Sequence, residues 1–442
     1  MTINELDILK TVENRQIIAD NLAEDPSVFA LKNRYSGAAT LATQLKYLQR
    51  SRSKLPTFYA AQAIIPPLAF EQCSSERAAS AKDFSGKRCL DLTCGLGVDS
   101  LHFSKSFQQV TSIERNSVLA ETVRFNFSLM NVENIEVINT DAENFVHNYT
   151  GEPFDLIYID PARRDGGGKK VFLPEDCAPN FVELLPILRK IGRKILVKMS
   201  PLYDVDAAFR QFENVAEVGV ISVDNECKEV LLIFENTDLI KGNDALINAL
   251  NTPSNPSIFI KCLTKNQLFS FSKNTDLSAN SRENELLNDA LACKFVFNSE
   301  PNDASKMALK TNFKSVFNYI VEPDVAFYKV RFLENAPPQY FDEKSTILTA
   351  SNGFFLSNNV EKTLDFPARI FHIEQAFNYQ PKRISAYLKT EKITALNVVQ
   401  RNFPFSTANI RTALKMREGG DFFLICTVFQ GEKWVFLAKR IF

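Results

Sequence analysis

The sequence lacks the features that mark secreted, zinc-binding or membrane proteins. No C-x-x-C pair and no cysteine–histidine cluster occurs, so neither a zinc site nor a disulfide framework is indicated. No segment approaches the roughly 18 uninterrupted apolar residues of a membrane helix, and residues 1–10 contain no signal-peptide core. We therefore expect a cytoplasmic protein with no metal and no membrane segment. Its eight cysteines are residues 73, 89, 94, 177, 227, 262, 293 and 426.

The sequence also lacks a strong net charge. It has 51 Lys and Arg against 52 Asp and Glu, which gives a formal net charge of -1 and a pI near 6.4. No global field therefore attracts nucleic acid or an anionic membrane, and any basic surface must be local. The length of 442 residues, with 45% hydrophobic residues, predicts a globular chain of two to four domains.

The first half of the chain changes from a helical to an alternating pattern. Residues 1–85 read as a helical extension, in which Leu41, Leu45 and Leu48 recur at helical spacing. From residue 86 to 240, β-rich runs alternate with helical stretches, as in a parallel sheet with crossover helices. We predict a seven-stranded, doubly wound α/β sheet whose last two strands form an antiparallel hairpin. The predicted strands are 88–92, 109–114, 134–138, 154–160, 193–199, 216–223 and 228–234.

Two further domains are predicted after residue 240. Residues 241–365 change composition, and we expect a small α+β domain there without a role that the sequence defines. Residues 366–442 alternate again between strands and helices. This last segment has twelve Lys or Arg against five acids, a formal charge of +7. The segment is therefore locally basic, although the chain as a whole has no net positive charge.

The turn after the first predicted strand runs from Asp91 to Gly97. Gly95 and Gly97 leave it without side chains, so the backbone can approach a ligand closely. A third glycine is missing, because Asp99 stands near its place, and this argues against a dinucleotide fingerprint. The turn instead favours an adenosyl ligand without phosphates, whose ammonium group could pair with Asp91. A ligand-free tight turn is the alternative.

Acids follow the second and third predicted strands. Glu114 could accept hydrogen bonds from both hydroxyls of a ribose. Asp141 could accept a hydrogen bond from an adenine amine, and Ala142 could offer its backbone amide. Each acid could equally cap the helix that follows it.

The turn, Glu114, Asp141 and the tetrapeptide Asp160-Pro161-Ala162-Arg163, in this order, resemble the class I S-adenosylmethionine-dependent methyltransferases. The resemblance covers residues 86–240 and implies S-adenosylmethionine as the cofactor. It places methionine at the glycine turn, ribose on Glu114 and adenine near Asp141. The cofactor-binding residues it implies are Asp91, Thr93, Gly95, Gly97, Glu114, Asp141 and Ala142.

Asp160 and Pro161 occupy the place of the Asp/Asn-Pro-Pro-aromatic motif of nucleic-acid amino-methyltransferases. In that motif the acid and a proline carbonyl accept hydrogen bonds from an exocyclic amine, so its lone pair faces the methyl donor. The second proline and the aromatic ring are replaced here, and a glycine-rich loop follows. We predict that this loop holds a base or a phosphate, or is simply solvated. The predicted substrate-binding residues are Ala162, Arg163, Arg164, Lys169 and Lys170.

Uracil-carbon methyltransferases carry a similar Asp-Pro-Pro-Arg, but they need a cysteine nucleophile after the fifth strand. Here that strand ends Lys198-Met199-Ser200-Pro201, without a cysteine. The sequence therefore favours a nitrogen target.

Three segments resemble a bacterial family of methyltransferases that ends in a THUMP-like domain. They are residues 66–76, 160–164 and 321–324. THUMP domains are associated with RNA, so the resemblance implies structured RNA such as transfer RNA as the partner. An RNA-binding protein with a silent methyltransferase fold and a methyltransferase of proteins or small molecules are the alternatives. The sequence does not give an oligomeric state.

Overall fold

The computed structural model describes most of the chain as two compact units. The first unit comprises residues 1–223, 227–263 and 272–274, and the second comprises residues 224–226, 264–271 and 275–442. Placement is described for residues 1–162, 174–212, 214–236, 256–264, 267–274, 317–330, 346–347, 353–357, 359–429 and 431–441. Within these residues, no helix has the length and apolar character needed to cross a bilayer.

The first unit begins with seven helices, as the sequence predicts for residues 1–85. Prolines begin three of them, where the missing amide proton costs nothing. Leu41, Leu45 and Leu48 form the buried face of the longest helix, α4. The helices are α1 (Ile3–Lys10), α2 (Val12–Asp20), α3 (Pro26–Lys32), α4 (Ala38–Lys54), α5 (Pro56–Ala60), α6 (Pro67–Gln72) and α7 (Glu76–Ser80).

These helices pack against α8 (Val98–Phe103) and α9 (Ser117–Leu129) through one apolar cluster that contains Leu45, Phe58 and Phe127. Buried amide groups fix the contact. The Asn126 side chain accepts a hydrogen bond from the Ile64 amide and donates one to its carbonyl, both at 2.8 Å. Such buried pairs are costly to leave unmade, so the helical extension is an integral part of the first unit.

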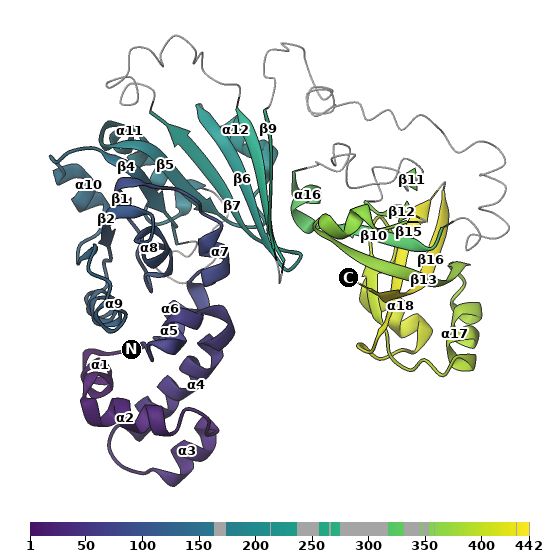
Figure 1. Ribbon diagram of the computed structural model, residues 1–442, viewed down its shortest axis with the longest axis horizontal. Helices are drawn as coiled ribbons and strands as arrows, with labels where there is room; N and C mark the ends of the chain where they lie inside the picture. The colour runs from purple at the N-terminus through teal and green to yellow at the C-terminus, as the bar shows by residue number, and fades with distance from the viewer. Residues whose placement is uncertain are drawn as a thin grey trace. The chain divides into compact units, whose positions relative to one another are not determined.

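The larger sheet contains the seven predicted strands and two more (Figure 1). The seven follow the order β3-β2-β1-β4-β5-β7-β6, in which β5 and β7 pair antiparallel. The α/β, doubly wound prediction is confirmed. Beyond it, β8 pairs in parallel with β6, and β9 ends the sheet. The strands are β1 (Gly86–Asp91), β2 (Phe107–Ile113), β3 (Ile135–Ile138), β4 (Phe154–Ile159), β5 (Gly192–Met199), β6 (Val215–Val223), β7 (Glu226–Glu235), β8 (Ser257–Leu263) and β9 (Leu268–Asn274).

The added strands lie within the range 241–365 that the sequence assigns to a separate small domain. The predicted boundary near residue 240 itself falls outside the described residues. Strand β8 alternates buried Ile258, Ile260 and Cys262 with less buried residues, which is the pattern of a strand at a sheet face. The sheet therefore continues past that boundary, and the four-domain division stays a prediction.

Strand register brings the functional segments to one edge of the sheet. Asp91 of β1 pairs with Tyr158 of β4, and Tyr158 pairs with Leu196 of β5. Asp160 and Lys198 each lie two residues beyond this last pair. Because side chains alternate along parallel strands, the two side chains lie next to each other on the same face of the sheet. The remaining helices of this unit are α10 (Ala142–Asn148), η1 (Pro174–Asp176), α11 (Phe181–Ile191) and α12 (Val205–Gln211).

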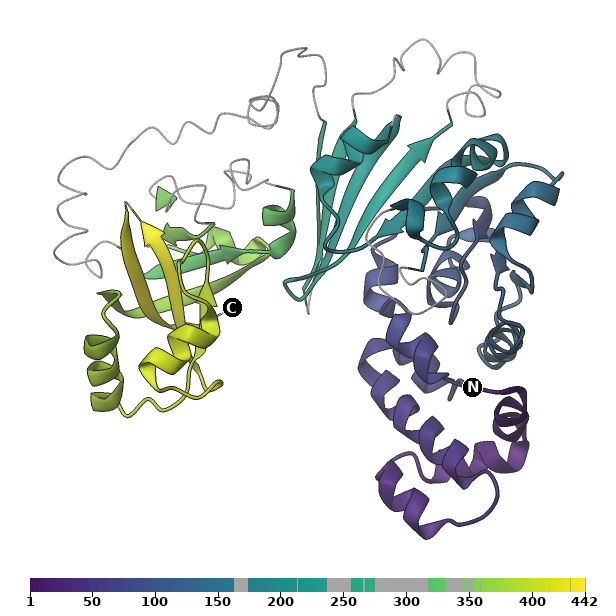
Figure 2. The same cartoon turned by 180° about the vertical axis from the view of Figure 1, so that it is seen from behind.

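The second unit is built on a sheet whose strands are drawn in green and yellow in Figure 2. Its seven strands have the order β11-β12-β10-β13-β16-β15-β14. The strands and helices predicted for the basic tail are confirmed. The elements are β10 (Tyr319–Pro323), α16 (Val325–Lys329), β11 (Thr346–Ile347), β12 (Phe355–Ser357), η6 (Lys362–Asp365), β13 (Ala368–Asn378), α17 (Pro381–Thr390), β14 (Asn397–Gln400), α18 (Thr407–Leu414), β15 (Phe422–Phe429) and β16 (Glu432–Arg440).

Some of the basic side chains of this unit form ion pairs within the unit. Glu322 is 1% exposed and pairs with Arg369 and Arg401, at 2.5 and 3.0 Å. Asp324 caps α16 by accepting a hydrogen bond from the Ala326 amide. Nine of the twelve cations of residues 366–442 remain exposed: Lys382, Arg383, Lys389, Lys392, Lys415, Arg417, Lys433, Lys439 and Arg440.

Candidate active site

The two glycines of the turn between β1 and α8 have different structural roles. Both have left-handed backbones, with φ of +56° at Gly95 and +82° at Gly97, which a side chain would strain. A Cβ atom at Gly97 would lie 2.7 Å from the ring of Phe127. At Gly95 it would meet only the Thr93 carbonyl oxygen, at 3.9 Å. Gly97 is therefore required by packing, whereas Gly95 borders open space that a ligand can fill.

Asp91 holds the turn from inside. It is fully buried, and its carboxylate accepts hydrogen bonds from the Thr93 amide at 3.0 Å and the Ser100 hydroxyl at 2.5 Å. Burial raises the pKa of Asp91 to about 7, although both hydrogen bonds oppose the shift. The geometry gives Asp91 a part in shaping the turn, while its contact with a ligand ammonium stays a prediction.

The raised pKa of Asp91 predicts a specific pH dependence of stability. Between the pKa of the unfolded chain, about 3.9, and about 7, the folded protein keeps a proton that the unfolded chain releases. The free energy of unfolding should therefore fall as pH rises, by up to about 1.4 kcal/mol per pH unit from this group, and level off above pH 7. Urea unfolding of wild type and Asp91→Asn from pH 4 to 8 isolates the effect as a difference. Parallel pH curves for the two proteins would refute it.

Glu114 closes the same turn from the end of β2. Its two carboxylate oxygens accept hydrogen bonds from the amides of Gly95 at 3.0 Å and Asn116 at 2.8 Å. Burial raises the pKa of Glu114 above its usual value, and these amides oppose the rise. Each oxygen has a second lone pair, so the carboxylate can still accept from a ribose hydroxyl.

Asp141 is the N-cap of α10, the alternative that the sequence left open. It accepts hydrogen bonds from the Asn144 amide at 2.7 Å and from the Asn144 side chain at 2.6 Å. Ala142 is the first residue of the helix and is buried. Contacts of these two residues with adenine stay predictions.

The loop after β4 is tied to the glycine turn and to a neighbouring loop. The Asp160 amide donates a hydrogen bond to the Thr93 hydroxyl at 2.6 Å. Ala162 exchanges two backbone hydrogen bonds with Ala178, at 2.7 and 3.1 Å. Pro161, between these anchors, is buried. The structure thus places Thr93 and Asp160 together, whereas Arg163, Arg164, Lys169 and Lys170 lie outside the described residues.

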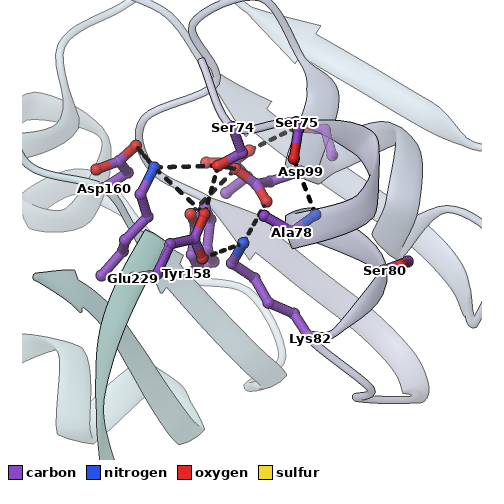
Figure 3. Close-up of polar contacts among 12 residues, drawn as sticks. Ser74, Ser75, Ala78, Ser80, Lys82, Asp99, Tyr158, Asp160 and Glu229 are labelled. Carbon is purple, nitrogen blue, oxygen red and sulfur yellow. Dashed lines mark hydrogen bonds and ion pairs between the residues drawn. The ribbon is translucent and has the colours of Figure 1, made fainter. Parts of the chain in front are cut away.

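Asp160 is connected to a chain of buried charged and polar side chains (Figure 3). Its Oδ2 lies 2.6 Å from Lys198 Nζ, and Lys198 donates to the Ser74 hydroxyl at 3.1 Å. Ser74 Oγ lies 2.8 Å from Glu229 Oε1 and 3.1 Å from Asp99 Oδ2. We call Ser74, Lys82, Asp99, Tyr158, Asp160, Lys198 and Glu229 the charged network.

Lys82 lies at the other end of the charged network and is 0% exposed. Its Nζ is 2.9 Å from Asp99 Oδ1 and 2.5 Å from Glu229 Oε2. Burial acts to lower the pKa of Lys82, but the two carboxylates outweigh it and raise the pKa. Burial likewise acts to raise the pKa of Asp99, and Lys82 with Lys198 outweighs it and lowers the pKa. Lys82 and Asp99 are therefore held in their ionised forms.

The sequence did not single out the charged network as a site, although it carried weak signals of it. Glu229 directly precedes the buried apolar run 230–234, and Lys198 interrupts the apolar end of β5. Asp99 stood out only as a replacement for a glycine. Charged residues inside central strands indicate a buried partner, but nothing in the sequence identifies which partner each one has.

Two protein-family models match the sequence, and each matches a part of one of the units described above. "Conserved hypothetical protein 95" matches residues 69–172, which contain the glycine turn and Asp160. "THUMP domain-like" matches residues 368–440, the basic tail. Together they confirm the resemblances drawn from the sequence.

Curated relatives each match a part of the chain. The ribosomal RNA small subunit methyltransferase D of Buchnera aphidicola is 30% identical over 93 residues, 20% of this chain and 48% of that protein. The 23S rRNA (uracil(1939)-C(5))-methyltransferase RlmD of Vibrio vulnificus strain CMCP6 is 35% identical over 86 residues, 19% of this chain and 20% of that protein. The chain thus spans less than half the length of these relatives.

A solved structure matches the whole fold. A candidate methyltransferase from Porphyromonas gingivalis W83 covers 98% of this chain and 98% of its own, with a TM-score of 0.72 and 23% identity. Both units described here therefore occur together in that protein. The chain shares the fold of that protein over nearly its whole length, and residues 368–440 match the THUMP-like model.

Proposed function

We propose that the protein is an S-adenosylmethionine-dependent methyltransferase that methylates a nitrogen, an exocyclic base amine, in structured RNA. One observation carries the proposal. Asp160 stands at the end of β4, and its backbone amide donates a hydrogen bond to the hydroxyl of Thr93 in the glycine turn. An acceptor for an amine and a turn suited to the cofactor thus meet at one edge of the sheet.

The residues of the turn fit S-adenosylmethionine. The open space at Gly95 would take the methionine part, close to backbone amides, with Thr93 and Gly97 shaping the turn. Glu114 would hold the ribose, and Asp141 with Ala142 would border the adenine. When bound, S-adenosylmethionine supplies an electrophilic methyl group on its sulfonium.

Asp160 and Pro161 would orient the acceptor nitrogen. Among the described residues, Asp160 Oδ2 is held by Lys198, and Oδ1 has no hydrogen-bond partner. Oδ1 and the Pro161 carbonyl would each accept a hydrogen bond from one N–H of the amine, which turns the nitrogen lone pair toward the methyl donor. Positioning of this kind supplies much of a rate enhancement without prior proton removal.

The cysteines support a nitrogen rather than a ring-carbon target. A ring carbon needs a thiolate to attack the pyrimidine. Asp99 and Lys198 both act on the pKa of Cys73, and burial raises that pKa to about 11. Cys73 is therefore a protonated thiol at neutral pH and a poor nucleophile. The uracil-carbon activity in the name of the Vibrio relative makes ring-carbon methylation the second candidate.

RNA is the acceptor that the relatives and the charge favour. Both relatives named above carry ribosomal RNA methyltransferase in their names. The exposed cations of the second unit can contact phosphates, and Ala162, Arg163, Arg164, Lys169 and Lys170 would hold the base or its phosphate. We propose ribosomal or transfer RNA as the acceptor and the cytoplasm as the place of action.

Incubation of the purified protein with methyl-labelled S-adenosylmethionine and total RNA tests the proposal. We expect label in RNA and a calorimetric signal for cofactor binding. Label only in protein or small-molecule fractions would indicate another acceptor. RNA binding without any label would instead indicate a silent methyltransferase fold.

A further inference from the structure

Lys198 occupies an unusual position for a strand residue. It comes from β5, the side chain is 12% exposed, and three oxygen atoms from three other segments surround its ammonium group. Asp160 Oδ2 lies at 2.6 Å, Ser74 Oγ at 3.1 Å and Glu229 Oε1 at 3.8 Å. Two of the three N–H donors of the ammonium group form hydrogen bonds, to Asp160 and Ser74, and Glu229 is an ion-pair partner. These contacts restrict the orientation of the Lys198 side chain.

This arrangement determines how Asp160 is presented. The Asp160 side chain is 31% exposed, so it faces the site, while Lys198 lies behind it. Because Lys198 binds only Oδ2, Oδ1 has no partner among the described residues and is available to accept a hydrogen bond. Free rotation of the carboxylate is prevented, since turning it would break the contact with Lys198.

The other charges near Asp160 are mostly negative. Asp99 and Glu229 face it from α8 and β7, Asp91 lies at the end of β1, and Tyr158 precedes it on β4. Lys82 balances Asp99 and Glu229 from the far side. Burial and the two acids raise the pKa of Asp160, and Lys198 is the described cation that opposes them. Without Lys198, the carboxyl would take up a proton more easily and then donate where an acceptor is needed.

We propose that Lys198 is a positioning residue that keeps Asp160 ionised and fixes its carboxylate so that Oδ1 faces the acceptor amine. Ser74 and Glu229 hold the ammonium group in place for this purpose. The proposal rests on the proposed function for its consequence in catalysis, but its electrostatic part belongs to the protein alone.

Carboxyl-carbon NMR of the full-length protein, labelled at the aspartate side chains, tests the electrostatic part without substrate. The Asp160 signal is assigned by its loss in Asp160→Asn. In Lys198→Met we expect its titration midpoint to move up by about 1 to 3 pH units, the usual influence of an adjacent opposite charge. Lys198→Arg retains the charge and should leave the midpoint close to that of wild type.

Lys194→Met is the matched control. Lys194 lies on the same strand, is 39% exposed, and pairs with Glu235 at 2.7 Å rather than with the charged network. We expect no movement of the Asp160 midpoint in this variant. Lys198→Gln is the second neutral variant should Lys198→Met not fold. An unchanged Asp160 midpoint in either neutral variant, folded by circular dichroism, would overturn the proposal.

The catalytic part is read from the pH profile of methyl transfer. In Lys198→Met the acidic limb of the profile should move to higher pH together with the Asp160 midpoint, and Lys198→Arg should restore it. A merely structural role would lower the rate at every pH equally. If wild type transfers no methyl group to RNA while the Asp160 midpoint moves as expected, the proposed function fails and the electrostatic role of Lys198 toward Asp160 stands.

Discussion

Replacement of Asp160 by asparagine should reduce methyl transfer at least about 100-fold while leaving the protein folded and able to bind its cofactor. The reason lies in the hydrogen bond that Asp160 would accept. An asparagine that turns its oxygen toward Lys198 presents an amide donor to the acceptor amine, and two donors then face each other. Loss of such a positioning contact costs about 10²-fold or more.

The reduction should appear in kcat, because the Asp160 backbone contact with Thr93 is kept and the turn should still bind the cofactor. Calorimetry with S-adenosylmethionine measures that directly. Asp176→Asn is the control, since Asp176 is exposed and lies beyond the same loop. A folded Asp160→Asn protein with the wild-type rate would remove Asp160 from the mechanism.

Replacement of Lys82 by methionine should cost about 3–5 kcal/mol of the free energy of unfolding. Lys82 is fully buried between Asp99 and Glu229, so its loss leaves two carboxylates without their shared cation. Breaking a buried charge pair from one side is costly, because the remaining charge stays desolvated. Chemical denaturation followed by circular dichroism measures the change.

Two variants make the Lys82 result specific. Lys87→Met removes an exposed lysine at the start of β1 and should change stability by less than about 0.5 kcal/mol. Combining Lys82→Met with Glu229→Gln should restore part of the lost free energy of unfolding. The second substitution removes one of the two carboxylate charges that Lys82→Met leaves without a cation. A loss below about 1 kcal/mol in Lys82→Met would mean that water or nearby groups compensate the two acids.

The core fold could be predicted because local patterns determine it. Most of the seven strands of the core contain an apolar run bounded by a turn, and the short link at 224–227 permits only a hairpin. The same reasoning missed the continuation of the sheet through β8 and β9. Their surroundings are rich in polar residues, and pairing between β6 and β8 is a long-range contact that no local pattern encodes.

The candidate site was predictable in part for the same reason. The glycine turn and Asp160 lie at the ends of successive strands, so their order in the sequence implies their meeting in space. Ser74, Lys82 and Glu229 come from distant segments, and their meeting depends on tertiary packing. Asp141 illustrates the limit differently, because capping α10 and bordering an adenine require the same residue type at the same position.

The central claim is that this site methylates a base nitrogen in RNA, and analysis of RNA nucleosides tests it most directly. Ribosomal and transfer RNA from a strain that lacks the protein would be compared by mass spectrometry with RNA from the same strain carrying wild type or Asp160→Asn. We predict that one N-methylated nucleoside disappears without the protein, returns with wild type and stays absent with Asp160→Asn. Loss of a 5-methylpyrimidine instead, or identical nucleosides in all the strains, would contradict the account.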